Sequence, residues 1–94
     1  MKVGVLDENS VKSFAPLSEQ SVLDNADIVL GAAVEGDDKN YAAAGIMAIK
    51  LIGTEADVLD FYVVEEHRNK GVGAELLKIW NIQWFHISFQ RIHR

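Results

Sequence analysis

Residues 56–77 run Ala-Asp-Val-Leu-Asp-Phe-Tyr-Val-Val-Glu-Glu-His-Arg-Asn-Lys-Gly-Val-Gly-Ala-Glu-Leu-Leu, and this stretch decides the fold. Residues 56–64 alternate with a period of two, which predicts a β-strand. The alternation assigns the side chains to two faces: Asp57, Leu59, Phe61 and Val63 on one, and Val58, Asp60 and Tyr62 on the other. After Gly71 the apolar residues recur at three- and four-residue steps: Val72, Leu76, Leu77, Trp80 and Trp84. A strand, a charged loop and an amphipathic helix that begins near Gly71 are therefore expected in that order.

The loop between this strand and this helix has the chemistry of an anion-binding site. The first amides of a helix have no acceptor within the helix and lie at the positive end of its dipole. Gly71 and Gly73 lack a Cβ atom, so a phosphate can approach their backbone closely. Arg68 and Lys70 add positive charge, and a guanidinium can bind phosphate oxygens in a bidentate manner. We therefore expect this loop to bind a diphosphate.

Two common phosphate-binding motifs do not match the loop. The dinucleotide fingerprint G-x-G-x-x-G/A needs a small residue where this chain has Leu76. The Walker loop needs Gly-Lys followed by Ser or Thr, whereas Lys70-Gly71 has the reverse order and no hydroxyl after it. Neither class of nucleotide site is therefore expected.

The preceding part of the chain predicts two short helices and a β-hairpin. Residues 8–25 have apolar residues at helical spacing and are split by Pro16, and Ser18 is suited to cap the second helix. Residues 27–35 and 41–52 have the pattern of strands, and the polar residues 35–40 between them predict a turn. With the strand at 56–64 they make a three-stranded antiparallel meander, and the fold class is α/β of the α+β type.

Length and composition limit the chain to one domain, residues 1–94, and exclude several functions. Its 94 residues include 49% apolar and 24% charged ones, as in ordinary globular proteins. The absence of cysteine removes disulfides, thiolate metal sites and thiol nucleophiles. The net charge of −5 argues against nucleic acid as a partner, because such binding relies on massed Lys and Arg.

Targeting and metal signals are not found in the sequence. Asp7 and Glu8 interrupt the first apolar residues, so a signal-peptide core is not expected. We therefore expect a cytoplasmic location. The apolar-rich residues 76–89 contain too many polar residues for a membrane span, which needs about 20 mostly apolar residues, so no membrane partner is expected. The histidines at 67, 86 and 93 have no metal-ligand spacing, so no metal is assigned.

The strand–loop–helix junction resembles the acyl-CoA signature of the GNAT superfamily of N-acyltransferases, Q/R-x-x-G-x-G/A after a bulged strand. The signature stands here as Arg68-Asn69-Lys70-Gly71-Val72-Gly73-Ala74. The family's upstream pattern V-x-P-x-Y-R corresponds to Val63-Val64-Glu65-Glu66-His67-Arg68, with Glu65 instead of Pro and His67 instead of Tyr. The resemblance implies a GNAT-like fold in which two short helices and the meander precede the pyrophosphate-loop helix.

The resemblance also implies acetyl-CoA as cosubstrate and places its parts on particular residues. The pyrophosphate would lie on the amides of Asn69, Lys70, Gly71, Val72, Gly73 and Ala74, with assistance from the side chains of Arg68 and Lys70. The pantetheine arm would pair with the end of the strand near Phe61, Val63 and Val64, and the amide of Val63 or Val64 would polarise the thioester carbonyl.

The acceptor in such a reaction is an amine, from a small molecule or a peptide, that attacks the thioester directly. An amine with a pKa of about 10.4 must first lose a proton, so a carboxylate is needed nearby. Many family members have an acidic residue six positions before the valine that is Val63 here, and that position is Asp57. Asp57 is therefore the candidate base, with Glu55 and Asp60 as competitors.

The chain is shorter than most members of the family. We expect it to cover the amino-terminal half of the fold and to lack the strand that diverges from the strand at 56–64, with residues 81–94 lengthening the helix or forming a strand. Apolar residues left uncovered by a partial domain predict a homodimer. Two functions stay open: an acetyl-CoA-dependent N-acetyltransferase, or an inactive CoA-binding or self-associating module derived from a truncated one.

Overall fold

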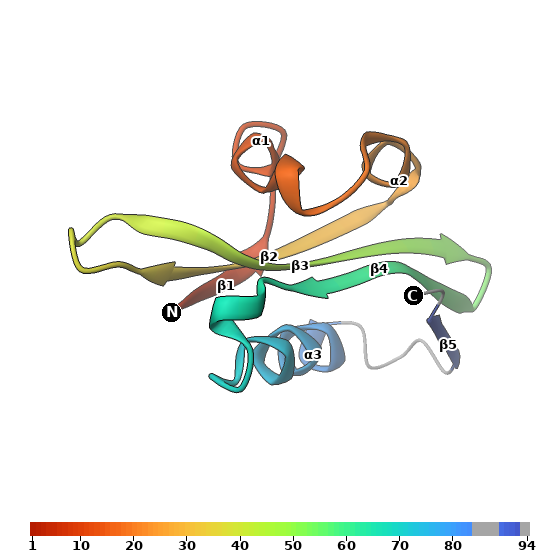
Figure 1. The fold of residues 1–94 in the computed structure, drawn as a ribbon. Helices are drawn as coiled ribbons and strands as arrows, with labels where there is room; N and C mark the ends of the chain where they lie inside the picture. Colours follow the sequence, from red (N-terminus) through yellow and green to blue (C-terminus); the bar gives the residue numbers. More distant parts are fainter. Residues whose placement is uncertain (84–88, 93–94) are drawn as a thin grey trace.

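The protein is a five-stranded sheet with helices on both faces (Figure 1). The structure is a computed structural model, and it describes residues 1–83 and 89–92. The elements along the chain are β1 (Lys2–Val5), α1 (Val11–Phe14), the 3-10 turn η1 (Ala15–Leu17), α2 (Gln20–Asn25), β2 (Ile28–Glu35), β3 (Tyr41–Ile52), β4 (Glu55–Val63), the 3-10 turn η2 (Glu65–His67), α3 (Val72–Gln83) and β5 (Phe89–Ile92).

The predicted helices, meander and α3 are confirmed, whereas β1 was not predicted and β5 lies in residues 81–94, for which a strand was one of two alternatives. The strands follow one another in the sheet in the order β1-β2-β3-β4-β5. β1 pairs antiparallel with β2, and β5 pairs parallel with β4. The expectation that a strand beside β4 would be lacking was wrong, because Phe89–Ile92 takes that place. The lengthened helix ends at Gln83, and residues 84–88 lie outside the described part.

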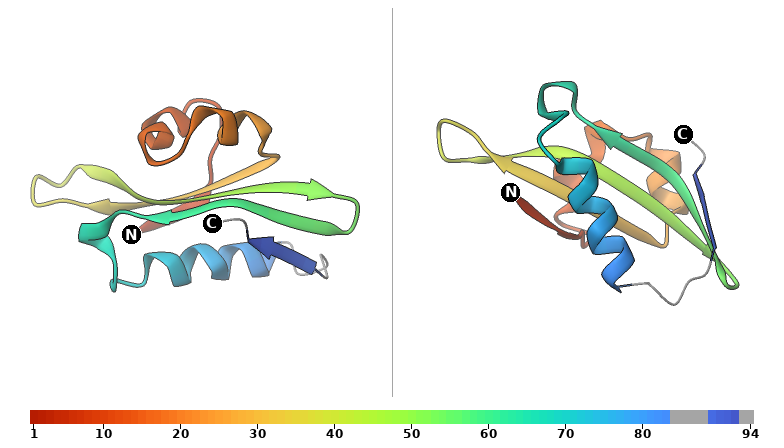
Figure 2. Two further views of the ribbon diagram at one scale, coloured as in Figure 1. Left: turned by 45° about the vertical axis from the view of Figure 1, so that its right-hand side comes forward. Right: turned by 90° about the horizontal axis from the view of Figure 1, so that it is seen from below.

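The elements form three layers, which the views of Figure 2 show from two sides. The segment with α1, η1 and α2 covers one face of the sheet, and α3 lies across the other face. The hairpin of β2 and β3 extends beyond both helical layers, where Gly36 and Asn40 close its turn with a hydrogen bond of 2.8 Å. No helix among the described residues has the length and apolarity needed to cross a bilayer.

A β-bulge at Leu59 changes which side chains of β4 share a face. Ala48 of β3 lies opposite Asp60, and the next residue, Ile49, lies opposite Val58, so Leu59 has no opposite residue. Strict alternation therefore holds only on each side of Leu59. The predicted assignment of Asp57 and Phe61 to one face was wrong for this reason.

Cross-strand partners identify the two faces, because directly opposite residues point the same way. Lys50 reaches α2, where its Nζ donates to the carbonyl of Asn25, so its partner Asp57 faces the N-terminal helices. Asp60 and Tyr62, opposite Ala48 and Ile46, face the same side. Phe61 and Val63 point instead to α3, where they lie 3.5 and 3.7 Å from the place of a Cβ on Gly73.

The main core lies between the sheet and α3. Val72, Leu76 and Trp80 of α3 are buried against apolar side chains of β2, β3 and β4 that include Leu30, Met47, Ile49 and Val58. A Cβ added at Gly45 of β3 would lie 2.8 Å from Val72 Cγ1, so glycine there lets the first turn of α3 approach the sheet closely. Apolar packing thus fixes the start of α3 relative to β4.

The opposite face is covered by the N-terminal helices. Phe14 of α1 packs on Gly31 of β2, and Ile46 and Ala48 of β3 are fully buried on this side. Glu19 stands at the start of α2 without a side-chain cap, so the prediction that Ser18 caps this helix was wrong. The hydroxyl of Ser18 donates a hydrogen bond to Asp60 on β4 instead.

Candidate functional site

The loop that joins β4 to α3 is a compact turn with two left-handed residues. The turn η2 is closed by a hydrogen bond from His67 N–H to the carbonyl of Val64. Asn69 and Gly71 then adopt φ angles of +67° and +82°. Asparagine and glycine are the residues that tolerate this conformation best, so the sequence allows the chain to reverse here. Left-handed residues also turn neighbouring amides toward a common point, as in anion-binding nests.

The first turn of α3 presents three amides in the direction of this loop. The first helical hydrogen bond runs from Glu75 N–H to the carbonyl of Gly71, at 3.0 Å. The amides of Val72, Gly73 and Ala74 precede it and have no acceptor within the helix. Gly71 occupies the capping position and has no side chain that could satisfy them. This end of α3 therefore has the donors that an anion requires.

The two glycines of the predicted signature have different surroundings. Around Gly71, no described residue other than its two chain neighbours comes within 4 Å of the place of a Cβ, so its backbone is open to a ligand. At Gly73 a Cβ would point at Phe61 and Val63 of β4, at ordinary contact distances. Gly73 can thus offer a ligand its amide, whereas its small size serves the packing of α3 on β4.

The end of β4 has backbone groups directed away from the sheet. The amide of Val64 donates to the carbonyl of Ala44 on β3, at 2.8 Å. Because backbone groups of successive residues in an antiparallel strand point alternately toward and away from the neighbour, those of Val63 and Phe61 point outward. Of the two amides that the resemblance offers for the thioester carbonyl, only that of Val63 is directed away from β3.

β5 covers only the first part of this outer edge. Its residues pair with Glu55, Ala56, Asp57 and Val58. On the side of β4 away from β3, the pairing with β5 ends at Val58, and no described strand continues it along residues 59–63. An extended molecule with amide groups could add there as a further strand. The free edge leads directly into the loop and the amides at the start of α3.

Arg68 connects the loop to this edge. Its Nε donates to the carbonyl oxygen of Val63 at 3.0 Å, and its guanidinium carbon lies 5.7 Å from the centre of the Tyr62 ring. The side chain is exposed, and a guanidinium with one donor engaged retains four others. Arg68 thus lies where it can contact a ligand at both the edge and the loop.

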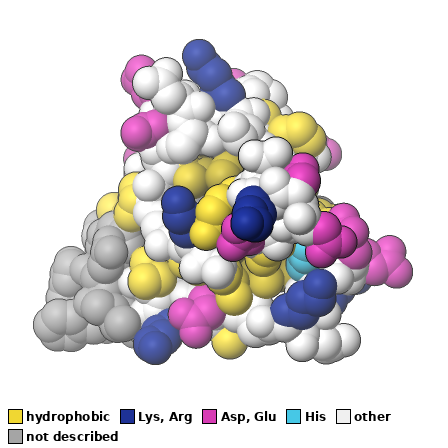
Figure 3. Space-filling view, turned by 90° about the vertical axis from the view of Figure 1, so that its left-hand side faces the viewer, with side chains coloured by type: hydrophobic (Ala, Val, Ile, Leu, Met, Phe, Trp, Pro, Cys, Tyr) yellow, Lys and Arg dark blue, Asp and Glu magenta, His cyan; other side chains and the backbone are white. Residues whose placement is uncertain are grey.

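Charges of both signs surround the loop. Arg68 and Lys70 are exposed, and Glu65 and Glu66 of η2 are exposed next to them. Figure 3 shows basic and acidic side chains interspersed over this end of the molecule. Among the described residues, no three His, Asp or Glu side chains converge so as to hold a metal ion.

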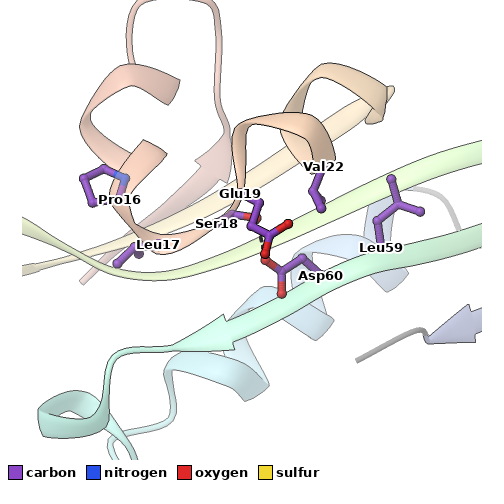
Figure 4. Close-up of a pocket in the computed structure, with 7 residues that line it drawn as sticks. All are labelled: Pro16, Leu17, Ser18, Glu19, Val22, Leu59 and Asp60. Carbon is purple, nitrogen blue, oxygen red and sulfur yellow. Dashed lines mark hydrogen bonds between the residues drawn. The ribbon is translucent and has the colours of Figure 1, made fainter.

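A pocket of about 480 Å³ lies on the other face of β4, between the bulge and the segment that leads into α2 (Figure 4). It is lined by Pro16, Leu17, Ser18, Glu19, Val22, Leu59 and Asp60. Its polar groups are two carboxylates and one hydroxyl, and none of these described lining residues is basic. The pocket therefore favours cations.

Asp60 is the most buried polar group of this pocket. Its side chain is 4% exposed and accepts a hydrogen bond of 2.5 Å from Ser18 Oγ. The predicted base, Asp57, is also buried, but it belongs to the part of β4 that pairs with β5, and it does not line the pocket. Sequence reasoning named Asp60 only as a competitor and missed Ser18 and Glu19. The two aspartates three residues apart were the available signal, but only the bulge brings them to one face.

The comparisons with known proteins bear on the fold. No protein-family model matches the sequence, and a search of curated proteins finds no match either. Solved structures do match. The chain superimposes on the ribosomal-protein-alanine N-acetyltransferase of Brucella melitensis biovar Abortus 2308 with a TM-score of 0.73 and 20% identity, covering 98% of this chain and 78% of that one.

Two other solved structures agree with this match. A GNAT-family acetyltransferase from Streptococcus pneumoniae TIGR4 gives a TM-score of 0.73 at 16% identity, covering 99% of this chain and 74% of that one. The aminoglycoside N-acetyltransferase AAC(6')-Iy in complex with CoA gives a TM-score of 0.71 at 11% identity, covering 99% of this chain and 78% of that one. The chain thus has the fold of GNAT-family N-acetyltransferases and spans about three quarters of their length, which confirms the resemblance and the predicted fold class.

Proposed function

We propose that this protein transfers an acetyl group from acetyl-CoA to a primary amine. The observation that carries the proposal is the continuity between the uncovered edge of β4 and the open amides of α3. A strand edge suits the amide-bearing pantetheine arm of CoA, and a helix N-terminus suits its diphosphate. The fold that this chain shares with the N-acetyltransferases, one of them in complex with CoA, supports the same assignment.

The residues of the loop have separate tasks in holding the cosubstrate. The amides of residues 69–74 bind the diphosphate, with Gly71 leaving space for it and the side chains of Arg68 and Lys70 adding charge. The side chain of Val72 is buried in the core, so this residue contributes only its amide. Phe61 and Val63 pair with the pantetheine arm through the backbone groups on the outer edge.

The Val63 amide polarises the thioester carbonyl, and a carboxylate on β4 accepts the proton of the amine. Asp57 and Asp60 are the two buried carboxylates of this strand, and both face the N-terminal helices. The amine itself binds in the acidic pocket, whose carboxylates attract a cation. A substrate that carries its own carboxylate would meet repulsion there.

Release of free thiol from acetyl-CoA tests this function. The protein is incubated with acetyl-CoA and a panel of amines: polyamines, aminoglycosides, peptides with a free N-terminus and free amino acids. We expect thiol release with cationic amines that lack a carboxylate. CoA binding without thiol release for any amine would reject the enzyme and favour the inactive CoA-binding module.

The homodimer remains a prediction. It rests on the apolar residues after Gln83, whose side chains lie outside the described part of the structure. Sedimentation of the protein over a range of concentrations would test it.

A further inference from the structure

We infer that Asp60 accepts the proton of the amine and that Ser18 positions its carboxylate for this step. The inference rests on the proposed function and assigns the proton transfer within it. It begins from a costly feature of the fold: Asp60 is 4% exposed in a small domain, and a buried carboxylate needs a compensating partner. The hydroxyl of Ser18 is such a partner, and it comes from 42 residues away in the chain.

The pocket gives the buried carboxylate access to a ligand. Asp60 and Glu19 both line the pocket of about 480 Å³, and Figure 4 shows the Ser18–Asp60 hydrogen bond on its wall. Asp57 does not line this pocket. An amine bound between the two carboxylates of the pocket can therefore reach Asp60 directly.

Position along β4 also favours Asp60. A strand rises about 3.3 Å per residue, so Asp60 lies roughly 10 Å along the strand from the Val63 amide and Asp57 roughly 20 Å. Asp60 also belongs to the part of β4 that β5 leaves uncovered, whereas Asp57 pairs with β5. One or two waters can relay a proton from an amine at the thioester to Asp60, whereas Asp57 would need a longer chain of waters.

The ammonium group gives one proton through water to the Asp60 carboxylate, and its nitrogen lone pair then attacks the thioester carbon. The C–N bond forms, the C–S bond breaks, and the departing sulfur takes the second proton from nitrogen. Asp60 finally releases its proton to solvent through the pocket. Glu19 lines the same pocket, and the titratable residues of β3 and β4 on this face include Lys50, Glu55, Asp57 and Tyr62.

The test compares Asp60→Asn, Asp57→Asn, Ser18→Ala and Ser18→Thr in the thiol-release assay, with an amine that the parent protein acetylates. For Asp60→Asn we expect kcat to fall by about 10² to 10⁴-fold at pH 7. This deficit should shrink toward pH 10, because the amine then loses its proton to water. Asp57→Asn tests the competing carboxylate of β4, and a loss of kcat there that equals or exceeds that of Asp60→Asn would overturn the assignment. The matched control is Asp37→Asn, an exposed aspartate in the turn of the β2–β3 hairpin, which should keep the parent kcat.

The Ser18 variants test the positioning role. Ser18→Ala should lower kcat about tenfold with an unchanged KM for acetyl-CoA, the scale of one hydrogen bond to a charged group. Ser18→Thr keeps the hydroxyl and should restore most of kcat. Equal losses in both Ser18 variants would overturn the positioning role.

Folding of each variant is checked by CoA titration. Every variant should bind CoA with the parent affinity. Parent-like kcat in Asp60→Asn at pH 7 would overturn the assignment while leaving acetyl transfer intact. A deficit that stays constant from pH 7 to pH 10 would overturn it too, since a structural defect has no reason to follow the protonation of the amine. Thiol release by no amine, in the parent as well, would reject the proposed function together with this inference.

Discussion

Arg68 Nε donates a hydrogen bond to the main-chain carbonyl of Val63, 3.0 Å away, at the edge of β4 where backbone groups point away from the sheet. A pantetheine arm that adds to this edge has to compete with this bond, whereas the diphosphate gains a cation when Arg68 turns toward the loop. The residue thus has opposite effects on the two halves of one ligand.

Replacing Arg68 by alanine should separate these effects. We expect Arg68→Ala to weaken CoA binding about tenfold, because a hydrogen bond between two charged groups contributes more than one to a neutral carbonyl. Pantetheine, which lacks the diphosphate, should bind the variant as well as the parent or better. Calorimetric titration measures both ligands, and Lys78→Ala, an exposed cation on α3, serves as the control. Unchanged affinity for CoA in Arg68→Ala would remove Arg68 from the site.

The two glycines of the loop should respond differently to alanine. Gly71 has a φ of +82°, so Gly71→Ala should lower the free energy of unfolding by about 1–2 kcal/mol. A Cβ at Gly73 meets Phe61 at 3.5 Å, an ordinary contact, and alanine favours the helix. Gly73→Ala should therefore leave the free energy of unfolding unchanged or slightly raised. Urea denaturation measures both, and equal destabilisation of the two variants would contradict the loop geometry.

The packing of α3 on the sheet depends on Gly45. A Cβ there would lie 2.8 Å from Val72 Cγ1 and 3.2 Å from Leu76 Cδ1, so Gly45→Ala should destabilise the protein by about 1–3 kcal/mol. Gly4 of β1 has nothing within 4 Å of the place of a Cβ among the described residues, and Gly4→Ala is the control. A melting temperature of Gly45→Ala equal to that of Gly4→Ala would show that α3 does not pack as described.

The turn before α1 should make stability depend on pH. Hydrogen bonds from the Ser10 amide, the Ser10 hydroxyl and the Asn9 amide hold the pKa of Asp7 below its ordinary value of 3.8. A lowered pKa in the folded protein stabilises it above pH 3.8, and this contribution is lost as pH falls through the folded pKa. Asp7→Asn should therefore be less stable than the parent at pH 7, and the difference should shrink below pH 3.8. Denaturation at pH 7, 4 and 2.5 checks this, and a difference that is constant with pH would exclude Asp7 as the source.

The sequence was sufficient where local chemistry decides the structure. The β-branched residues in 28–34 predicted β2, and the polar residues 35–40 predicted the turn after it. The change of period after Gly71 predicted α3. β1 was missed and β5 was left open between helix and strand, because four-residue strands are too short for a pattern of their own. Each forms by pairing with a strand that is distant in the chain: β1 pairs with β2, and β5 pairs with β4.

The candidate site divides in the same way. The residues of the loop and of α3 are consecutive, so a motif could identify them. The pocket depends on the bulge at Leu59, which puts Asp57 and Asp60 on one face, and on Ser18, whose hydroxyl was expected to cap α2 but bonds to Asp60. A one-residue bulge leaves no signature in the alternation of β4, and a contact over 42 residues leaves none in local sequence.

The most direct measurement of the central claim is a titration of the isotope-labelled protein with CoA, followed residue by residue through its amide resonances. We expect the largest shifts at the amides of residues 69–74 and at Phe61 and Val63, with little change at the tip of the β2–β3 hairpin. Saturating CoA that leaves the amides of Val72, Gly73 and Ala74 unshifted, or that shifts residues elsewhere instead, would contradict it.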